Sequence, residues 1–429
     1  MNTHIKQINK EELWMRIKKN LQRLKEPYYQ ISEVFADASY DWPGDKEGRA
    51  LLAFVCHYQM HGEKIPCMDE MIEQLPQKTN QYFYFGKTNS EIIDEQQLSG
   101  HNWYLRGLLS YYEQFGDERV LMYAKSTVEH LYLLTRGAFD GYPIQRDERG
   151  GDVSGHSTGK QDGWLLSSDV GCAFMSIDGL AHYYCVTKDE NVLLLLNEMR
   201  VKFDSIDKMQ IKAQTHCCLT AARGFILLYQ EIGDENYLHS AIEVANLYLE
   251  KGMTYTYQNY NWWNKGNTWT EPCAIVDSLM VMTELYKITG DTDYRTTAAR
   301  IFHNGFSTAQ VGNGGAGTNT VVNEKEPILK SLLYEAYFCC TMRMAEGLLY
   351  ILKNQELLYA EVDKVHKDEQ GRYWAGDILY AEVSIAREYE GMITDAKTVI
   401  VDGKKLRPIV KYYDLPKQVT DTIEQRIVF

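Results

Sequence analysis

The chain has 429 residues, of which 45% are hydrophobic and 24% are charged, and its formal net charge is −14. This composition is typical of a globular protein with a substantial core, and nine prolines suit a largely helical chain. The acidic balance speaks against nucleic acid as the main partner, because phosphate binding depends on clustered Lys and Arg.

Hydropathy and cysteine content predict the compartment. Residues 1–20 lack the apolar run of a signal peptide, and no later stretch reaches the roughly 18 apolar residues that span a bilayer. The nine cysteines are an odd number and include two adjacent pairs, so reduced thiols are favoured over a disulfide framework. We expect a cytoplasmic protein with no membrane partner.

The first element in the chain is predicted to be an amphipathic helix. Between residues 9 and 26, apolar side chains recur at helical spacing: Leu13, Ile17, Leu21 and Leu24. Residues 41–49 then form a turn around Pro43-Gly44, and the apolar run of residues 50–58 indicates the next helix.

A two-part pattern recurs from that helix onward. An apolar helical run ends in a short turn and a second helical run follows; the turns are His61-Gly62-Glu63, Gly116-Asp117-Glu118, Lys188-Asp189-Glu190, Gly233-Asp234-Glu235 and Gly290-Asp291-Thr292. The Gly supplies a left-handed residue that ends one helix, and the Asp caps the next. A weaker sixth repeat begins at Cys340 and continues after Asn354.

Six helical hairpins cannot each bury an apolar face alone, so they should stack side by side. We predict an all-α fold, an α/α toroid, over residues 1–358, with residues 1–40 as leading helix and entry segment. The alternative is an open solenoid. Uneven repeat spacing and long loops at residues 87–102, 139–166 and 255–270 favour the ring, since enzymes carry such loops on their working face.

The composition changes after residue 358. Residues 377–385 and 398–401 are short β-rich runs, and Asp402-Gly403 is a hairpin signal. We therefore expect a small β-rich segment over residues 359–429.

Two short clusters carry the chemistry that the sequence suggests. Glu271-x-Cys273 and the adjacent Cys339-Cys340 offer one carboxylate and three thiols, a donor set that Zn²⁺ accepts. The alternative is that these cysteines are buried small hydrophobic residues. His216-Cys217-Cys218 is a second candidate ligand set, which would serve a different zinc-dependent reaction.

Four motifs carry a resemblance to a known family: Asn259-Tyr260-Asn261-Trp262, Trp269-Thr270-Glu271-Pro272-Cys273-Ala274, Asn313-Gly314-Gly315-Ala316-Gly317 and Tyr337-Phe338-Cys339-Cys340-Thr341. With the hairpin repeats over residues 41–350, they resemble the bacterial β-L-arabinofuranosidases of glycoside hydrolase family 127. The resemblance implies zinc held by Glu271, Cys273, Cys339 and Cys340, with Cys339 as the nucleophile of a retaining mechanism.

The general acid/base of that family is a Glu that precedes the Glu-x-Cys motif. The matching position here is Tyr255, and residues 253–270 contain no acidic side chain. Tyr255 and Tyr257 can donate a phenol proton but are poor bases, and Glu250 is expected to be a solvated surface charge. The chain is therefore predicted to be a glycosidase or, alternatively, a catalytically impaired sugar-binding or scaffold protein on the same fold.

Further polar and aromatic side chains on the expected loops are candidates for binding the carbohydrate substrate: Asp41, Trp42, Asp45, His101, Trp103, Asp169, His216, Tyr257 and Trp262. Flat aromatic faces and hydroxyl-binding acids are typical of sugar sites. Turn, cap or core roles explain several of them equally well. The sequence does not specify the sugar, and it leaves open a homo-oligomer.

Overall fold

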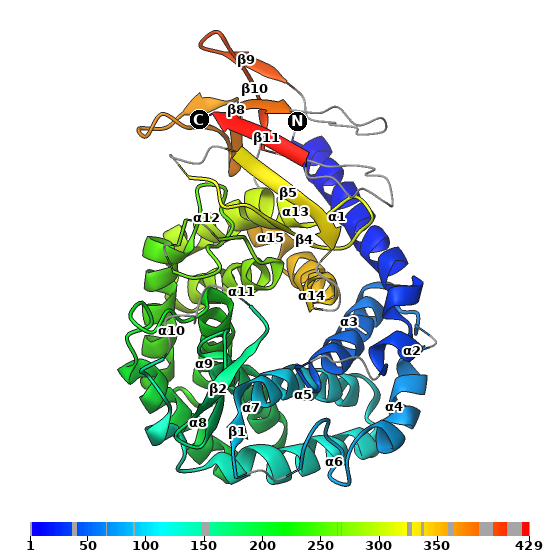
Figure 1. Cartoon of the computed structure of the whole chain (residues 1–429). Helices are drawn as coiled ribbons and strands as arrows, with labels where there is room; N and C mark the ends of the chain where they lie inside the picture. Colours follow the sequence, from blue (N-terminus) through cyan, green and yellow to red (C-terminus); the bar gives the residue numbers. More distant parts are fainter. Residues whose placement is uncertain are drawn as a thin grey trace. The chain divides into compact units, whose positions relative to one another are not determined.

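The structure is a computed structural model and describes residues 2–36, 41–65, 67–88, 91–146, 154–263, 265–266, 268–323, 328–335, 339–358, 364–385, 398–409 and 423–428. The chain divides into two compact units (Figure 1). One is continuous, Pro27–Tyr248, and the other combines Met1–Glu26 with Leu249–Phe429. Among the described helices, none has the length and apolar content needed to cross a bilayer.

In its described residues, the continuous unit contains four helical hairpins. They are α3 (Asp45–His61) with α4 (Cys67–Lys78), α5 (Glu95–Phe115) with α6 (Glu118–Thr127), α7 (Ser176–Thr187) with α8 (Glu190–Ser205), and α9 (Thr215–Ile232) with α10 (Glu235–Leu247). The first helices of the hairpins pack on one another in chain order, α3 on α5, α5 on α7 and α7 on α9. Short helical segments connect them: η1 (Pro27–Tyr29), α2 (Ile31–Val34), η2 (Val128–Tyr132), η3 (Leu133–Thr135), η4 (Phe139–Gly141) and η5 (Cys172–Met175).

The hairpin turns have the predicted chemistry. The helices end in left-handed residues at Gly62, Gly116, Lys188, Gly233 and Gly290. The following helices begin with capping aspartates, because the side chains of Asp117, Asp189, Asp234 and Asp291 accept backbone N–H bonds two residues on. Local turn chemistry therefore sets the lengths of these helices.

The expected loops at residues 87–102 and 139–166 contain regular structure that the polar composition did not predict. Strands β1 (Ile93–Asp94), β2 (Ser157–Gln161) and β3 (Trp164–Ser167) form a sheet of order β1-β3-β2. Asp94 then caps α5 by accepting hydrogen bonds from the N–H groups of Gln96 and Gln97. The helix therefore begins at Glu95, inside the predicted loop.

The discontinuous unit contains the fifth hairpin and a sixth helix pair. α11 (Pro272–Thr289) pairs with α12 (Thr292–Arg300), which continues through the π-helix η7 (Ile301–Phe306) into α13 (Ser307–Ala309). α14 (Cys339–Lys353) packs on α11, and the leading helix α1 (Asn2–Leu24) packs on α14. The predicted second helix of the sixth repeat is only α15 (Gln355–Leu358), and α1 is the long partner of α14. The π-helix η6 (Tyr248–Gly252) contains the point in the sequence, between Tyr248 and Leu249, where one unit ends and the other continues.

A largely antiparallel sheet confirms the predicted C-terminal β-structure. Its strands are β4 (Gly317–Asn319), β5 (Ile328–Glu335), β6 (His366–Lys367), β7 (Tyr373–Ala375), β8 (Ile378–Ile385), β9 (Val399–Val401), β10 (Lys404–Pro408) and β11 (Ile423–Val428). The main path is β4-β5-β11-β8-β10-β9, and β7 joins β6 to β8. Since β4 and β5 precede residue 358, the sheet takes strands from the predicted helical region, and the domain boundary at 358 stays a prediction.

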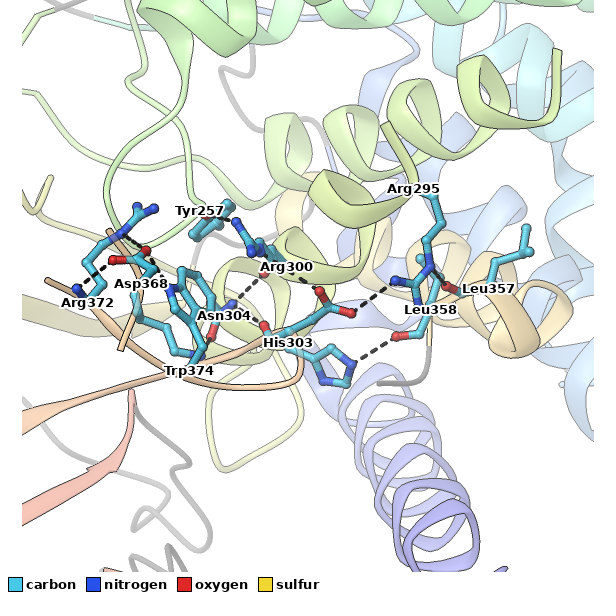
Figure 2. Close-up of polar contacts among 12 residues, drawn as sticks. Tyr257, Arg295, Arg300, His303, Asn304, Leu357, Leu358, Asp368, Arg372 and Trp374 are labelled. Atoms are coloured by element: carbon cyan, nitrogen blue, oxygen red, sulfur yellow. Dashed lines mark hydrogen bonds and ion pairs between the residues drawn. The ribbon is translucent and has the colours of Figure 1, made fainter. Parts of the chain in front are cut away.

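Figure 2 shows polar contacts between this sheet and the helices of its own unit. The Asn304 side chain donates to the Asp377 carbonyl at 3.0 Å and accepts from the Leu379 N–H at 2.9 Å. The Asp377 carboxylate lies 3.3 Å from the Arg295 guanidinium. Strand β8 and the turn before it are thus bound to η7 by buried hydrogen bonds and to α12 by a part-buried ion pair.

Candidate metal centre

Three cysteines meet at the start of two neighbouring helices. Cys273 is the second residue of α11, and Cys339 and Cys340 are the first two residues of α14. The Sγ atom of Cys340 lies 3.5 Å from that of Cys273 and 3.4 Å from that of Cys339. All three are free thiols, since a disulfide requires about 2.05 Å between sulfurs.

The donor set fits a zinc ion. Tetrahedral coordination with Zn–S bonds of about 2.3 Å places two sulfur ligands roughly 3.8 Å apart, close to the separations observed. Hydrogen bonding with the Cys273 and Cys339 thiols, together with burial, raises the pKa of Cys340 well above its usual range. Three sulfurs this close cannot all ionise without a nearby positive charge. A bound cation would supply that charge, and the positive ends of the α11 and α14 dipoles favour the same ionisation.

Glu271 is the predicted fourth ligand. It occupies the N-cap position of α11, and its side chain makes no capping hydrogen bond to the helix. One of its carboxylate oxygens lies within 4.8 Å of the Cys273 sulfur. Its backbone N–H donates to the Asn259 Oδ1 atom at 2.8 Å, which fixes the entry of the chain into α11. The carboxylate is therefore close to the Cys273 thiol, whereas the converging group of described residues that contains Cys339 and Cys340 does not include it.

A buried carboxylate that the sequence reading missed lies next to the Cys339-Cys340 pair. Glu335, at the end of β5, accepts a hydrogen bond of 2.6 Å from the Thr341 hydroxyl and another of 2.6 Å from the Arg23 Nε atom. The Thr341 hydroxyl also accepts from the Ala316 N–H at 2.9 Å. These contacts hold the first turn of α14. Residues 337 and 338 of the family motif lie outside the described residues.

The tyrosines at the expected acid position belong to a tight turn. Thr254 donates its N–H to the Gln258 carbonyl at 2.9 Å, and Tyr255 lies at the tip with 36% of its surface exposed. Tyr257 is buried and its hydroxyl accepts from the Arg300 guanidinium at 3.2 Å (Figure 2). Gly305 allows this packing, because a Cβ there would meet the Tyr257 carbonyl at 2.1 Å. Of the two tyrosines, Tyr255 is the accessible one.

Trp262 lies buried in the same long loop. Its ring meets that of Trp269 edge-on, with centroids 5.2 Å apart, and the Lys265 ammonium lies 5.1 Å from its centroid. Trp262 thus packs beside the segment that leads into Glu271.

In the continuous unit, Asp45, Trp103 and His216 are brought together through Arg49. The Asp45 carboxylate lies 2.7 Å from the Arg49 Nε atom, and the Arg49 guanidinium lies 3.9 Å above the Trp103 ring. The Trp103 ring in turn stacks on His216, with centroids 6.1 Å apart. These three predicted substrate-binding residues form one buried polar and aromatic row across α3, α5 and α9.

The other predicted binding residues of this unit have different surroundings. His101 is fully buried, with its Nδ1 atom 2.7 Å from the Gln97 carbonyl and its Nε2 atom accepting from the Phe85 N–H at 3.0 Å. Burial lowers the pKa of His101 to about 4. Asp169 accepts from the side chain of Gln214, the N–H of Gly155 and the hydroxyl of Ser154. Asp41 is exposed and Trp42 is half-buried. A sugar-binding role for these four stays a prediction.

The alternative ligand set around Cys217 and Cys218 is not assembled. Both thiols are buried in α9, and the Cys217 thiol donates to the Gln214 side chain at 2.9 Å. Among the residues that the structure describes, no group of three converging metal-binding side chains includes either cysteine.

Comparison with solved structures identifies proteins of similar fold. A GH127 β-arabinofuranosidase, BT3674, matches with a TM-score of 0.53 and 11% identity, covering 100% of this chain and 76% of its own. An unsaturated glucuronyl hydrolase specific for heparin matches at 0.54 and 11%, over 81% and 98% of the two chains. Cellobiose 2-epimerase from Bacillus thermoamylovorans B4167 matches at 0.51 and 14%, over 82% and 100%. These similarities confirm the predicted fold class, an α/α toroid with a small antiparallel sheet.

The family follows from the sequence itself. The family model described as β-L-arabinofuranosidase, GH127 catalytic domain, matches residues 63–346. The chain therefore belongs to the GH127 β-L-arabinofuranosidase family, as its motifs predicted, and this is a family of glycosidases. No individually curated protein sequence matches the chain.

Proposed function

We propose that the protein hydrolyses a terminal β-L-arabinofuranosyl or related sugar by a retaining mechanism with a zinc-bound cysteine thiolate as nucleophile. The observation that carries this proposal is the convergence of Cys273, Cys339 and Cys340 at the starts of α11 and α14, inside a GH127 domain. Glu271 is the proposed fourth ligand, and the substrate is a carbohydrate.

Differences in exposure support the proposed roles of the sulfurs. Cys273 and Cys340 are buried, whereas Cys339 is half-buried, so Cys339 is the sulfur that an anomeric carbon can approach. Bound zinc would keep its cysteine ligands ionised near neutral pH, which a thiol needs in order to attack carbon. In this scheme the Cys339 sulfur forms a bond to the anomeric carbon as the glycosidic bond breaks, and water later releases the sugar.

The leaving oxygen needs a proton, and Tyr255 is the group we propose for it. Its side chain is partly exposed at the position where the family resemblance places the acid. A phenol can donate to a leaving alkoxide but is a weak general base, so the second step would be slow. Replacement of Tyr255 by Phe should reduce turnover more than binding.

Elemental analysis and two cysteine variants test the proposal. Protein purified with reductant should contain about one zinc per chain, and Cys339→Ala should abolish turnover of an aryl β-L-arabinofuranoside. Cys67→Ala is the matched control, because Cys67 is a partly buried thiol whose pKa burial raises to about 11. Zinc-free wild-type protein, or full activity in Cys339→Ala, would rule out the thiolate mechanism.

The second candidate function is a sugar-binding or scaffold protein. Its support is the absence of any acidic residue from residues 253–270, where Tyr255 holds the position of the family's acid. Titration calorimetry with arabinose-containing oligosaccharides, combined with a panel of aryl glycosides, separates the two functions. Binding without hydrolysis of any glycoside would favour the second, and its loss in His216→Ala would assign that residue to the sugar.

A further inference from the structure

The two helices that carry the cysteines are connected at three levels. At their N-termini, the Cys273 and Cys340 sulfurs lie 3.5 Å apart. One turn on, the Asp277 carboxylate pairs with the Arg343 guanidinium. Two turns further, the Glu284 carboxylate accepts a hydrogen bond of 2.5 Å from Tyr350. Because the residue numbers increase together on both helices, α11 and α14 run parallel, and the Asp277–Arg343 pair is the side-chain connection next to the sulfurs.

The middle level is an ion pair without access to water. The side chains of Arg343 and Asp277 are 1% and 0% exposed, and Arg343 also contacts the Glu346 carboxylate, which is 9% exposed. Burying one cation between two carboxylates costs desolvation energy that the attraction only partly recovers. Such a group is weak support for stability, but it penalises any arrangement in which the partners separate.

Close packing at the same level leaves little room for adjustment. A Cβ added to Gly347 of α14 would meet the Val276 side chain of α11 at 2.9 Å and the Phe306 ring at 2.7 Å. A shift of one residue along a helix axis is about 1.5 Å, which is most of a Zn–S bond length. The spacing between Cys273 and the Cys339-Cys340 pair therefore depends on the register that Arg343 and Asp277 define.

We propose that Arg343 is a positioning residue of the metal centre, which holds the α11–α14 register through Asp277 and Glu346 and so preorganises the three sulfurs for one ion. This inference rests on the metal centre of the proposed function. According to this inference, metal binding also depends on Arg343, which lies one helical turn away from the ligands. Arg343 itself would contact neither the ion nor the substrate.

Metal affinity of the full-length protein tests the proposal, with Arg343→Met as the main variant. Zinc affinity is measured by competition with a chelating dye, and Co²⁺ is added to the zinc-free protein so that its absorption reports thiolate coordination. We expect zinc affinity to fall by about 10- to 100-fold, the usual loss when support for metal ligands is removed. The sulfur-to-cobalt absorption should weaken in parallel.

Three further variants separate register from general stability. Tyr350→Phe removes the third connection of the same helix pair, and Arg146→Met removes a buried ion pair with Glu95 in the other unit. Both should lower the unfolding midpoint while leaving zinc affinity within about threefold of wild type. Asp277→Asn leaves Arg343 in place and keeps the side-chain volume at position 277. This variant provides the measurement if Arg343→Met does not fold. It should weaken zinc binding by about tenfold.

The outcomes are distinguishable. Unchanged zinc affinity in folded Arg343→Met or Asp277→Asn, with zinc bound by the wild type, overturns the register proposal alone. Equal losses of affinity in Arg343→Met and Arg146→Met also overturn it, because the effect would then be general destabilisation. A wild-type protein that binds neither Zn²⁺ nor Co²⁺ overturns the proposed metal centre and this inference with it.

Discussion

Asn20 of α1 donates a hydrogen bond of 3.1 Å to the carbonyl of Thr341, the residue that follows Cys340. The same amide donates to the Gly314 carbonyl at 3.0 Å, and Asn20 is fully buried. The leading helix is thus a direct support of the corner where the adjacent cysteines lie.

Replacement of Asn20 by Ala should destabilise the protein by about 1–3 kcal/mol, because two buried carbonyls lose their donor. Urea denaturation measures the change, and Gln22→Ala, at an exposed position of the same helix, should have little effect. Equal stability of the two variants would show that α1 does not support this corner.

We expect Trp374 to stabilise the packing of the C-terminal sheet on α12 and on the turn that contains Tyr257. Its ring lies 4.2 Å from the Arg300 guanidinium and 5.7 Å from the Tyr257 ring, and its Nε1 donates to Asp368 at 2.9 Å. Trp374→Ala should cost about 3–5 kcal/mol and increase amide hydrogen exchange in the turn at residues 253–259. Ile400→Ala, in the same sheet but 78% exposed, is the control. Unchanged amide hydrogen exchange in the turn would show that Trp374 does not stabilise the turn through Tyr257.

Metal removal should lower thermal stability. An ion that binds only the folded state stabilises it by about 2.7 kcal/mol when free metal is 100-fold above its Kd. The wild-type melting temperature should therefore fall in a strong chelator and recover with added zinc. Cys273→Ala should melt at one temperature under both conditions, and a chelator response in that variant would point to an ion elsewhere.

The buried Glu47 carboxyl group should make the stability of the protein depend on pH. Burial raises its pKa from the ordinary value of 4.5 to about 8, so at neutral pH the folded state holds a proton that the unfolded state releases. Stability should therefore fall as pH rises from about 4.5 to 8, and level off above that range. Glu47→Gln, which is neutral at every pH, should remove this slope and add on the order of 1–3 kcal/mol at pH 7.5. Glu63→Gln, at an exposed site, should leave the slope unchanged, and persistence of the slope in Glu47→Gln would assign it to other groups.

The predictable features were those that local chemistry decides. Gly and Asp at the hairpin turns fix where each helix ends and the next begins, so the order of helices could be read from residues 61–62, 116–117 and 233–234. The three cysteines could be found because they stand in two short motifs, Glu271-x-Cys273 and Cys339-Cys340, which also carry the family resemblance. The sheet β1–β3 could not, since its strands pair residues 93–94 with 164–165 across a polar stretch.

The parts of the candidate site that the sequence did not predict depend on tertiary contacts. Glu335 and Asn20 both support Thr341, from 6 and 321 residues away along the chain, and neither belongs to a recognisable pattern. The Asp277–Arg343 pair lies in two largely apolar helices, in which charged residues are few. Their importance follows only from burial, which a sequence pattern does not encode.

The discontinuous unit has a consequence for the order in which the protein folds on the ribosome. Pro27–Tyr248 is complete in the chain once its last helix has been made, whereas α1 must wait for α14, more than 300 residues later, before its apolar face is covered. Contacts of such sequence separation form slowly, and an unpaired amphipathic helix is prone to aggregation meanwhile. During synthesis, α1 therefore stays without its partner α14 until almost the whole helical part of the chain has been made.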